Sequence, residues 1–171
     1  DGANKSITQR ADDFTNMRDR ITVLRMVDKF FEENVKEQEL WDAKYYKWLY
    51  IDLMIYVNNC IYLSDNRTLE MMKIIKDYIE ETIPLETIDK LPVLYREKYV
   101  ALMNLDEKRL VKLRQYEVDN YKNLKIVKKG NKYIGKFPKA IVTGDKADMT
   151  EALDQWRLTQ LIYDVAWQKE Q

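Results

Sequence analysis

Residues 40–63 read LWDAKYYKWLYIDLMIYVNNCIYL, the longest predominantly apolar stretch of the chain. Apolar and aromatic side chains fall on nearly every side of the helix that it would form, and such a helix belongs inside a protein. We therefore expect it to be the central helix of a bundle. Asp52 interrupts the run, and a buried carboxylate needs a cation to offset its desolvation. We therefore expect Asp52 to form a structural salt bridge with an arginine such as Arg18 or Arg25.

Amphipathic patterns on both sides of this stretch predict further helices. Apolar residues recur every three or four positions over 12–34, and similar patterns follow over about 69–83, 91–102 and 106–121. Pro84 ends one of these helices, and Asp106 can cap another. Short connections favour antiparallel neighbours. The predicted fold class is mainly α, with residues 1–123 forming an antiparallel bundle of about five helices.

Helical periodicity ends near residue 124. Residues 124–127 and 133–134 indicate two short strands joined by a turn at Lys129, Gly130 and Asn131, so residues 124–155 are expected to form a short β-hairpin followed by a loop. Apolar residues alternate from Trp156 onward, which indicates a terminal strand over 156–171, the first of a following domain. The alternative is a sixth helix over 149–167, because Leu153 and Leu161 also nearly fit a helical face.

The composition excludes several functions. Histidine is absent, which removes the commonest acid–base residue and transition-metal ligand. The four glycines form no phosphate-binding loop. The 29 basic and 29 acidic residues give no net charge, so we expect no nucleic-acid partner. A single cysteine, Cys60, is typical of a reducing compartment, and no stretch reaches the roughly 20 apolar residues of a membrane span. These features indicate a cytoplasmic protein.

No catalytic or metal-ligating residue stands out. Asp52 with Glu32 or Glu33 would supply the carboxylate pair of a glycoside hydrolase, but chance pairs are common among 29 acidic residues. The tyrosines of residues 40–63 could stack on sugars, although aromatic side chains on so apolar a helix usually serve packing. We predict that this chain does no chemistry itself.

Three stretches together resemble the region after the catalytic domain in bacterial family-2 glycosyltransferases of the teichoic-acid and capsular-polysaccharide polymerase type. DGANKSITQR (1–10) with NMRDRITVLRMVDKFFEEN (16–34) resembles the element and long helix that leave the GT-A catalytic domain. YIDLMIYV (50–57) is similar to the central linker helix. NLKIVKKGNKYIGKFP (123–138), ADMTEAL (147–153) and LIYDVAWQKEQ (161–171) resemble the hairpin, the turn and the first strand of the β-sandwich that follows.

The resemblance implies a non-catalytic linker that positions the catalytic domain relative to a downstream domain, with the flanking domains of its own chain as partners. The parent glycosyltransferase would use a divalent metal and a nucleotide-activated donor at the inner face of the cell membrane, and this segment would hold no cofactor. Five residues near the start would lie closest to the catalytic domain and are the candidates for substrate binding: Asp1, Gly2, Ser6, Thr8 and Arg10.

An alternative function depends on the basic segment 122–139, whose lysines would contact a protein, an anionic membrane surface or an anionic surface polymer. The candidate surface-binding residues are Lys125, Lys128, Lys129, Lys132 and Lys136. A solvated hairpin with lysines protecting its edge is the simpler interpretation of the same pattern.

Overall fold

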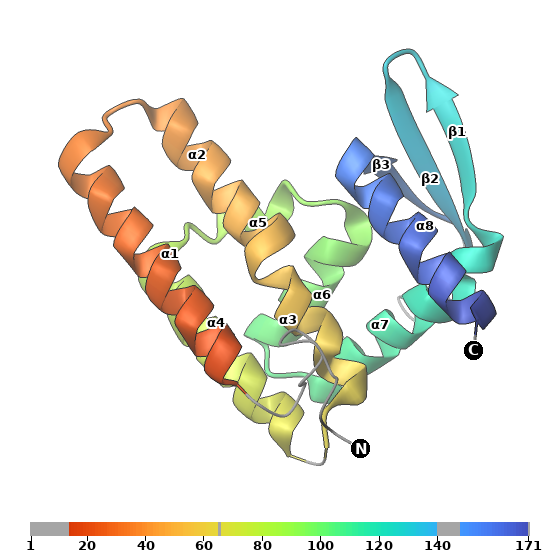
Figure 1. The fold of residues 1–171 in the computed structure, drawn as a ribbon, viewed down its shortest axis with the longest axis horizontal. Coiled ribbons are helices and arrows are strands. Elements are labelled where there is room, and N and C mark those ends of the chain that lie inside the picture. Colours follow the sequence, from red (N-terminus) through yellow and green to blue (C-terminus); the bar gives the residue numbers. More distant parts are fainter. Residues whose placement is uncertain (1–13, 65, 140–147, 171) are drawn as a thin grey trace.

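The structure, a computed structural model, describes residues 14–64, 66–139 and 148–170 and is mainly helical with a small three-stranded antiparallel sheet (Figure 1). The helices are α1 (Thr15–Asn34), α2 (Gln38–Lys47), the π-helix η2 (Trp48–Asp52), α3 (Met54–Asn58), the 3₁₀-helix η3 (Asn59–Tyr62), α4 (Arg67–Thr82), α5 (Glu86–Asp89), α6 (Val93–Met103), α7 (Glu107–Asn120), the 3₁₀-helix η4 (Tyr121–Asn123) and α8 (Gln155–Glu170). The strands are β1 (Lys125–Lys129), β2 (Lys132–Lys139) and β3 (Asp148–Leu153).

Each helix predicted before residue 124 has a counterpart in the structure. α4 ends at Thr82, two residues before Pro84, as the proline requires. Asp106 caps α7, because its side chain accepts a hydrogen bond of 3.1 Å from the backbone N–H of Arg109. The helix predicted from residue 12 is described only from α1 onward.

The helix predicted over 40–63 is buried as expected, but it is not one uninterrupted α-helix. Leu49, Leu53 and Val57 are fully buried. Between α2 and α3 the backbone widens into the π-helix η2, where the N–H of Leu53 donates to the carbonyl of Trp48 over 2.9 Å. A π-turn contains one residue more than an α-helical turn, so it rotates the side chains that follow it around the helix axis. Apolar periodicity alone does not reveal this rotation.

Asp52 is buried in an ion pair with an arginine, as predicted, but the arginine is Arg20 instead of Arg18 or Arg25. Lys47 Nζ lies 2.7 Å from the Asp52 carboxylate, and Arg20 Nη1 lies 3.4 Å from it. In the wider π turn, residues five apart lie above one another, which brings Lys47 over Asp52. Arg18 and Arg25 instead pair with Glu70 and Glu81 of α4.

The predicted hairpin is present. β1 pairs antiparallel with β2, with Lys129 opposite Lys132 across the two-residue loop Gly130–Asn131. Gly130 has φ of +61°, a left-handed conformation that glycine adopts without strain. A glycine with positive φ at the first loop position is typical of the tight turns that match the twist of a hairpin.

Residues 148–153, expected to be loop, form β3, which pairs antiparallel with β2. This strand was missed because its partner, β2, is supplied by the tertiary structure.

The strand predicted over 156–171 is wrong, because residues 155–170 form α8, close to the sixth helix left as the alternative. Asp154 begins this helix by accepting a hydrogen bond of 2.7 Å from the N–H of Arg157. The buried residues Arg157, Leu158 and Leu161 then follow helical spacing.

The described residues form two hydrophobic clusters. The larger cluster contains side chains from the successive helices between α1 and α7. The smaller joins the C-terminal sheet and α8 to α6, α7 and η4, and its buried members are Leu94, Tyr116, Tyr121, Phe137, Leu153, Leu158 and Leu161. In Figure 1 the β1–β2 hairpin extends from this second core, on the side of the molecule opposite the α1–α2 pair. The sheet and α8 therefore share this core with α6, α7 and η4.

Candidate functional site: a buried ionic cluster between helices and sheet

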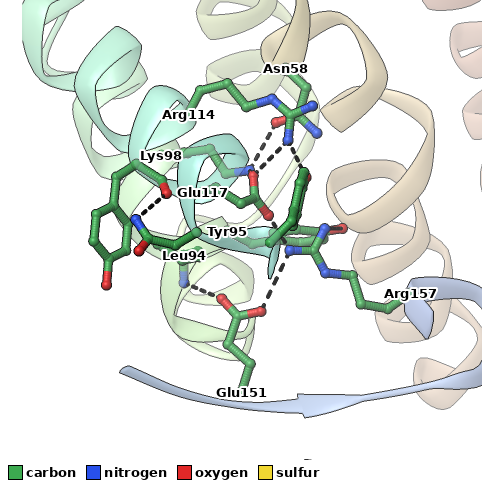
Figure 2. Close-up of polar contacts among 11 residues, drawn as sticks. Asn58, Leu94, Tyr95, Lys98, Arg114, Glu117, Glu151 and Arg157 are labelled. Carbon is green, nitrogen blue, oxygen red and sulfur yellow. Dashed lines mark hydrogen bonds and ion pairs between the residues drawn. The ribbon is translucent and has the colours of Figure 1, made fainter. Parts of the chain in front are cut away.

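Five charged side chains meet where α6, α7, β3 and α8 join (Figure 2). All are buried, with exposed fractions between 0% and 8%. They are Lys98 of α6, Arg114 and Glu117 of α7, Glu151 of β3 and Arg157 of α8, and we call them the Glu117 cluster.

Glu117 is the centre of the cluster because it contacts all three cations. Lys98 Nζ and Arg114 Nη1 each donate to Glu117 Oε2 over 2.8 Å, and Arg157 Nη2 donates to Oε1. Burial alone would raise the pKa of this carboxyl, but the charges of Arg157, Lys98 and Arg114 hold the pKa well below its usual value. Glu117 is therefore a permanent anion at neutral pH.

Each cation also has a second, neutral partner. Lys98 Nζ donates to Asn58 Oδ1 over 2.8 Å, and Arg114 Nη1 donates to the hydroxyl of Tyr121 over 2.6 Å. Arg157 Nη1 donates to the hydroxyl of Tyr95 over 3.1 Å. These contacts extend the cluster from α3 to η4, so that most of its polar groups are satisfied without solvent.

Glu151 caps a helix that is distant in sequence. Its Oε1 accepts a hydrogen bond of 2.8 Å from the backbone N–H of Leu94, in the first turn of α6. α6 has no local side-chain cap, so the carboxylate satisfies one of the free donors at its start. The other oxygen, Oε2, lies 3.9 Å from Arg157 Nη2, beyond hydrogen-bond distance. Burial raises the pKa of Glu151, and Arg157 only partly opposes this rise.

The cluster has more positive than negative groups. Three cations face two carboxylates, and burial lowers the pKa of Lys98 to about 8 despite the attraction of Glu117. Arg114 Nε and Arg157 Nε are buried without a hydrogen-bond partner among the described residues. Such an arrangement requires accurate placement of all four elements, because any displacement leaves a buried charge unpaired.

A second buried ion pair lies in the N-terminal part of the molecule. The carboxylate of Asp28 in α1 accepts hydrogen bonds from Lys44 Nζ (2.6 Å), Trp48 Nε1 (3.1 Å) and the hydroxyl of Tyr78 (2.6 Å). Lys44 also lies over the rings of Phe31, Trp41 and Tyr45, within 4.9 Å of each centroid. This Asp28 site joins α1, α2, η2 and α4.

The residues considered for catalysis are not brought together. Asp52 contacts Arg20, and Glu32 lies 12 residues further along α1, about 18 Å of helix away. Glu32 and Glu33 are exposed, whereas Asp52 is buried. Carboxylate pairs in glycoside hydrolases are about 5–10 Å apart. Cys60 is buried, and burial raises the pKa of its thiol to about 11, which makes it a poor nucleophile at neutral pH.

The other candidate residues separate into two groups. Asp1, Gly2, Ser6, Thr8 and Arg10 lie outside the described residues. Lys125, Lys128, Lys129, Lys132 and Lys136 are all exposed on the hairpin. Many of the tyrosines considered for sugar stacking are instead packed inside, with Tyr50 between Tyr95, Trp156 and Tyr46.

Sequence reasoning missed the Glu117 cluster, although a signal for it exists. Lys98 and Glu117 each lie four residues from a buried apolar residue on both sides, so each occupies the apolar face of its helix. The flanking pairs are Leu94 with Leu102 and Leu113 with Tyr121. Arg157 lies four residues before the buried Leu161, on the apolar face of α8. A charge on an apolar helical face indicates a buried ion pair, but the pattern does not identify the partner.

Comparison with known proteins finds no matching family model, no matching curated protein and no matching solved structure. Within residues 14–64, 66–139 and 148–170, no group of three or more acidic or cysteine side chains is placed to hold a metal ion. In the same part of the chain, no helix combines the length and the apolar character needed to cross a membrane.

Proposed function

We propose that this chain is a non-catalytic scaffold domain, an antiparallel helical bundle that holds neighbouring parts of a longer protein at a fixed distance and orientation. The Glu117 cluster carries this proposal, because it locks the sheet and α8 onto α6 and α7 with buried charges. Buried ion pairs contribute little net stability compared with apolar packing, but they penalise any other arrangement of the elements that carry them.

The resemblance of the sequence extends the proposal to the parent protein. It supports a bacterial cell-surface polysaccharide or teichoic-acid glycosyltransferase whose metal and nucleotide-activated donor bind in a separate catalytic domain. In that setting this domain would work at the inner face of the cell membrane and contact the flanking domains of its own chain.

Native-state hydrogen exchange tests the rigidity that a scaffold needs. We expect amides of β3 and of residues 155–163 to open with the same free energy as those of α6 and α7, because the Glu117 cluster joins them in one cooperative unit. The Glu117→Gln variant should lower the protection of β3 and α8 in particular. Arg25→Gln, which removes an exposed ion pair with Glu81, is the matched control and should change neither region. Protection of β3 and α8 that is much weaker than that of α6 in the unaltered chain would contradict a rigid scaffold.

Donor binding tests the non-catalytic part of the proposal. Titration of the chain with uridine and cytidine diphosphate donors, followed by calorimetry, should give no saturable heat. Saturable binding of any of these donors would assign the chain a part of the active site and would overturn the proposal.

A further inference from the structure

The register of the hairpin places four lysines on one face of the sheet. Side chains alternate between the two faces of a strand. Lys125, Val127 and Lys129 of β1 therefore share a face with their direct partners in β2, which are Lys136, Ile134 and Lys132. We call these six residues the lysine face. The fifth predicted lysine, Lys128, lies on the opposite face, where its ammonium is 5.8 Å from the ring of Tyr133.

The opposite face of β2 packs against the core. Phe137 is fully buried, and a Cβ atom on Gly135 would lie 2.7 Å from the side chain of Leu153. The lysine face consequently points away from the core, on a hairpin that extends beyond the helices in Figure 1. Val127, at the centre of the lysine face, is 52% exposed, and the four lysines around it are all exposed.

This arrangement of lysines lowers the stability of the hairpin in the isolated chain. The register places Lys129 directly opposite Lys132, and like charges directly opposite each other destabilise a sheet. Among the described residues, Lys125, Lys129 and Lys132 make no ion pair with a carboxylate. Protection of an exposed edge would explain lysines on β1, but Lys132 lies on β2, which is the central strand.

We propose that the lysine face is a docking surface for an anionic membrane. Its four lysines would contact lipid phosphates, while Val127 and Ile134 would enter the boundary between headgroups and acyl chains. The exposed Val127 beside the partly exposed Ile134 favours a bilayer over a soluble anionic polymer, which offers nothing apolar to contact. A nucleic-acid partner is disfavoured because the face has neither arginine nor an aromatic side chain for base stacking. Because the whole chain has no net charge, attraction to an anionic surface must come from a local face such as this one.

Sedimentation with lipid vesicles tests this docking surface. The chain should bind vesicles of equal parts phosphatidylglycerol and phosphatidylcholine, and salt should weaken this binding. It should not bind vesicles of phosphatidylcholine alone. Each lysine near an anionic surface contributes about fivefold to the binding constant, so Lys129→Gln with Lys132→Gln should weaken binding about 30-fold. The matched control is Lys108→Gln with Lys112→Gln on α7, which changes the net charge equally at exposed positions and should have little effect.

A second variant separates a membrane from a soluble polyanion. Val127→Thr keeps the β-branched shape and the charge but removes apolar surface, and should weaken vesicle binding about fourfold. It should leave binding to soluble polyphosphate unchanged. Polyphosphate binding as tight as vesicle binding, with Val127→Thr affecting neither, would identify a polyanion partner and overturn the membrane proposal. Absence of binding to anionic vesicles at low salt, or equal losses in the two lysine double variants, would overturn it as well.

Discussion

Two buried ionic sites among the described residues, the Asp28 site and the Glu117 cluster, differ in charge balance: the first is balanced and the second has an excess of positive charge. At the Asp28 site one carboxylate faces one ammonium, and neutral donors from Trp48 and Tyr78 complete its hydrogen bonds. In the Glu117 cluster two carboxylates face three cations, and only Glu117 contacts all three. The Asp28 site should therefore tolerate the loss of its carboxylate charge better than the Glu117 cluster.

The two sites also differ in what they join. The Asp28 site fastens α1, α2, η2 and α4 within the larger hydrophobic cluster. The Glu117 cluster joins elements that are far apart in sequence, with 40 positions between Glu117 and Arg157 and 57 between Leu94 and Glu151. An ionic network is thus used where the sheet and α8 meet the helices, at the smaller of the two hydrophobic clusters.

Glu117→Gln should have the largest effect. The change removes the anion and leaves Lys98, Arg114 and Arg157 buried without a strong counter-charge, which should lower the free energy of unfolding by about 4 kcal/mol. Urea denaturation followed by circular dichroism measures this loss. A loss below about 1 kcal/mol would mean that Glu117 does not hold the three cations.

The pH dependence of stability should reveal Lys98. Its folded pKa of about 8 is below the unfolded value of 10.5, so between these pH values the unfolded chain binds more protons. Stability from this group therefore rises as pH increases from about 8 to 10.5. Over that window, the free energy of unfolding of the unaltered chain should increase by about 3 kcal/mol relative to that of Lys98→Met.

The comparison with Lys98→Met removes the contributions of other groups. The raised pKa of Cys60, about 11, makes stability fall above pH 9, and the charge of Lys98 acts on this thiol, so both proteins should also carry Cys60→Ala to keep this effect out of the comparison. A stability difference that stays flat between pH 8 and 10 would contradict a depressed pKa at Lys98.

Asp28→Asn should have a smaller effect than Glu117→Gln. The amide oxygen can still accept from Lys44, and three aromatic rings partly stabilise the buried ammonium. We expect the free energy of unfolding to fall by about 2 kcal/mol. Thermal and urea denaturation of Asp28→Asn and Glu117→Gln at the same pH measure the two losses in free energy of unfolding. A larger loss for Asp28→Asn would contradict the expectation that the Asp28 site better tolerates the loss of its carboxylate charge.

Glu151→Gln should have the smallest effect. The raised pKa of Glu151 shows that its environment disfavours the charge, and a glutamine oxygen can still accept from the N–H of Leu94. A change of at most about 1 kcal/mol is expected, since a neutral acceptor replaces a poorly paired anion. The same chemical substitution at Glu117 is the internal control. Equal losses at the two positions would show that the cluster does not distinguish its carboxylates.

Local patterns sufficed to predict α1, α4, α6, α7 and the hairpin, but not α5 or the division of residues 40–63 into α2, η2, α3 and η3. Apolar residues at helical spacing mark α1, α4, α6 and α7, Asp106 marks the start of α7, and Gly130 marks the hairpin turn. Each of these features depends on the preferences of a few neighbouring residues, which operate before any tertiary contact forms.

Tertiary structure alone decided the remaining features. β3 exists because β2 supplies its hydrogen-bonding partner. Residues 155–170 form a helix instead of a strand because helical spacing places Leu158 and Leu161 in the second hydrophobic cluster. The partners of Asp52 and Glu117 also depend on which elements meet. A sequence can show that a charge lies on an apolar face, but the position of its counter-charge is set by packing between residues far apart in the chain.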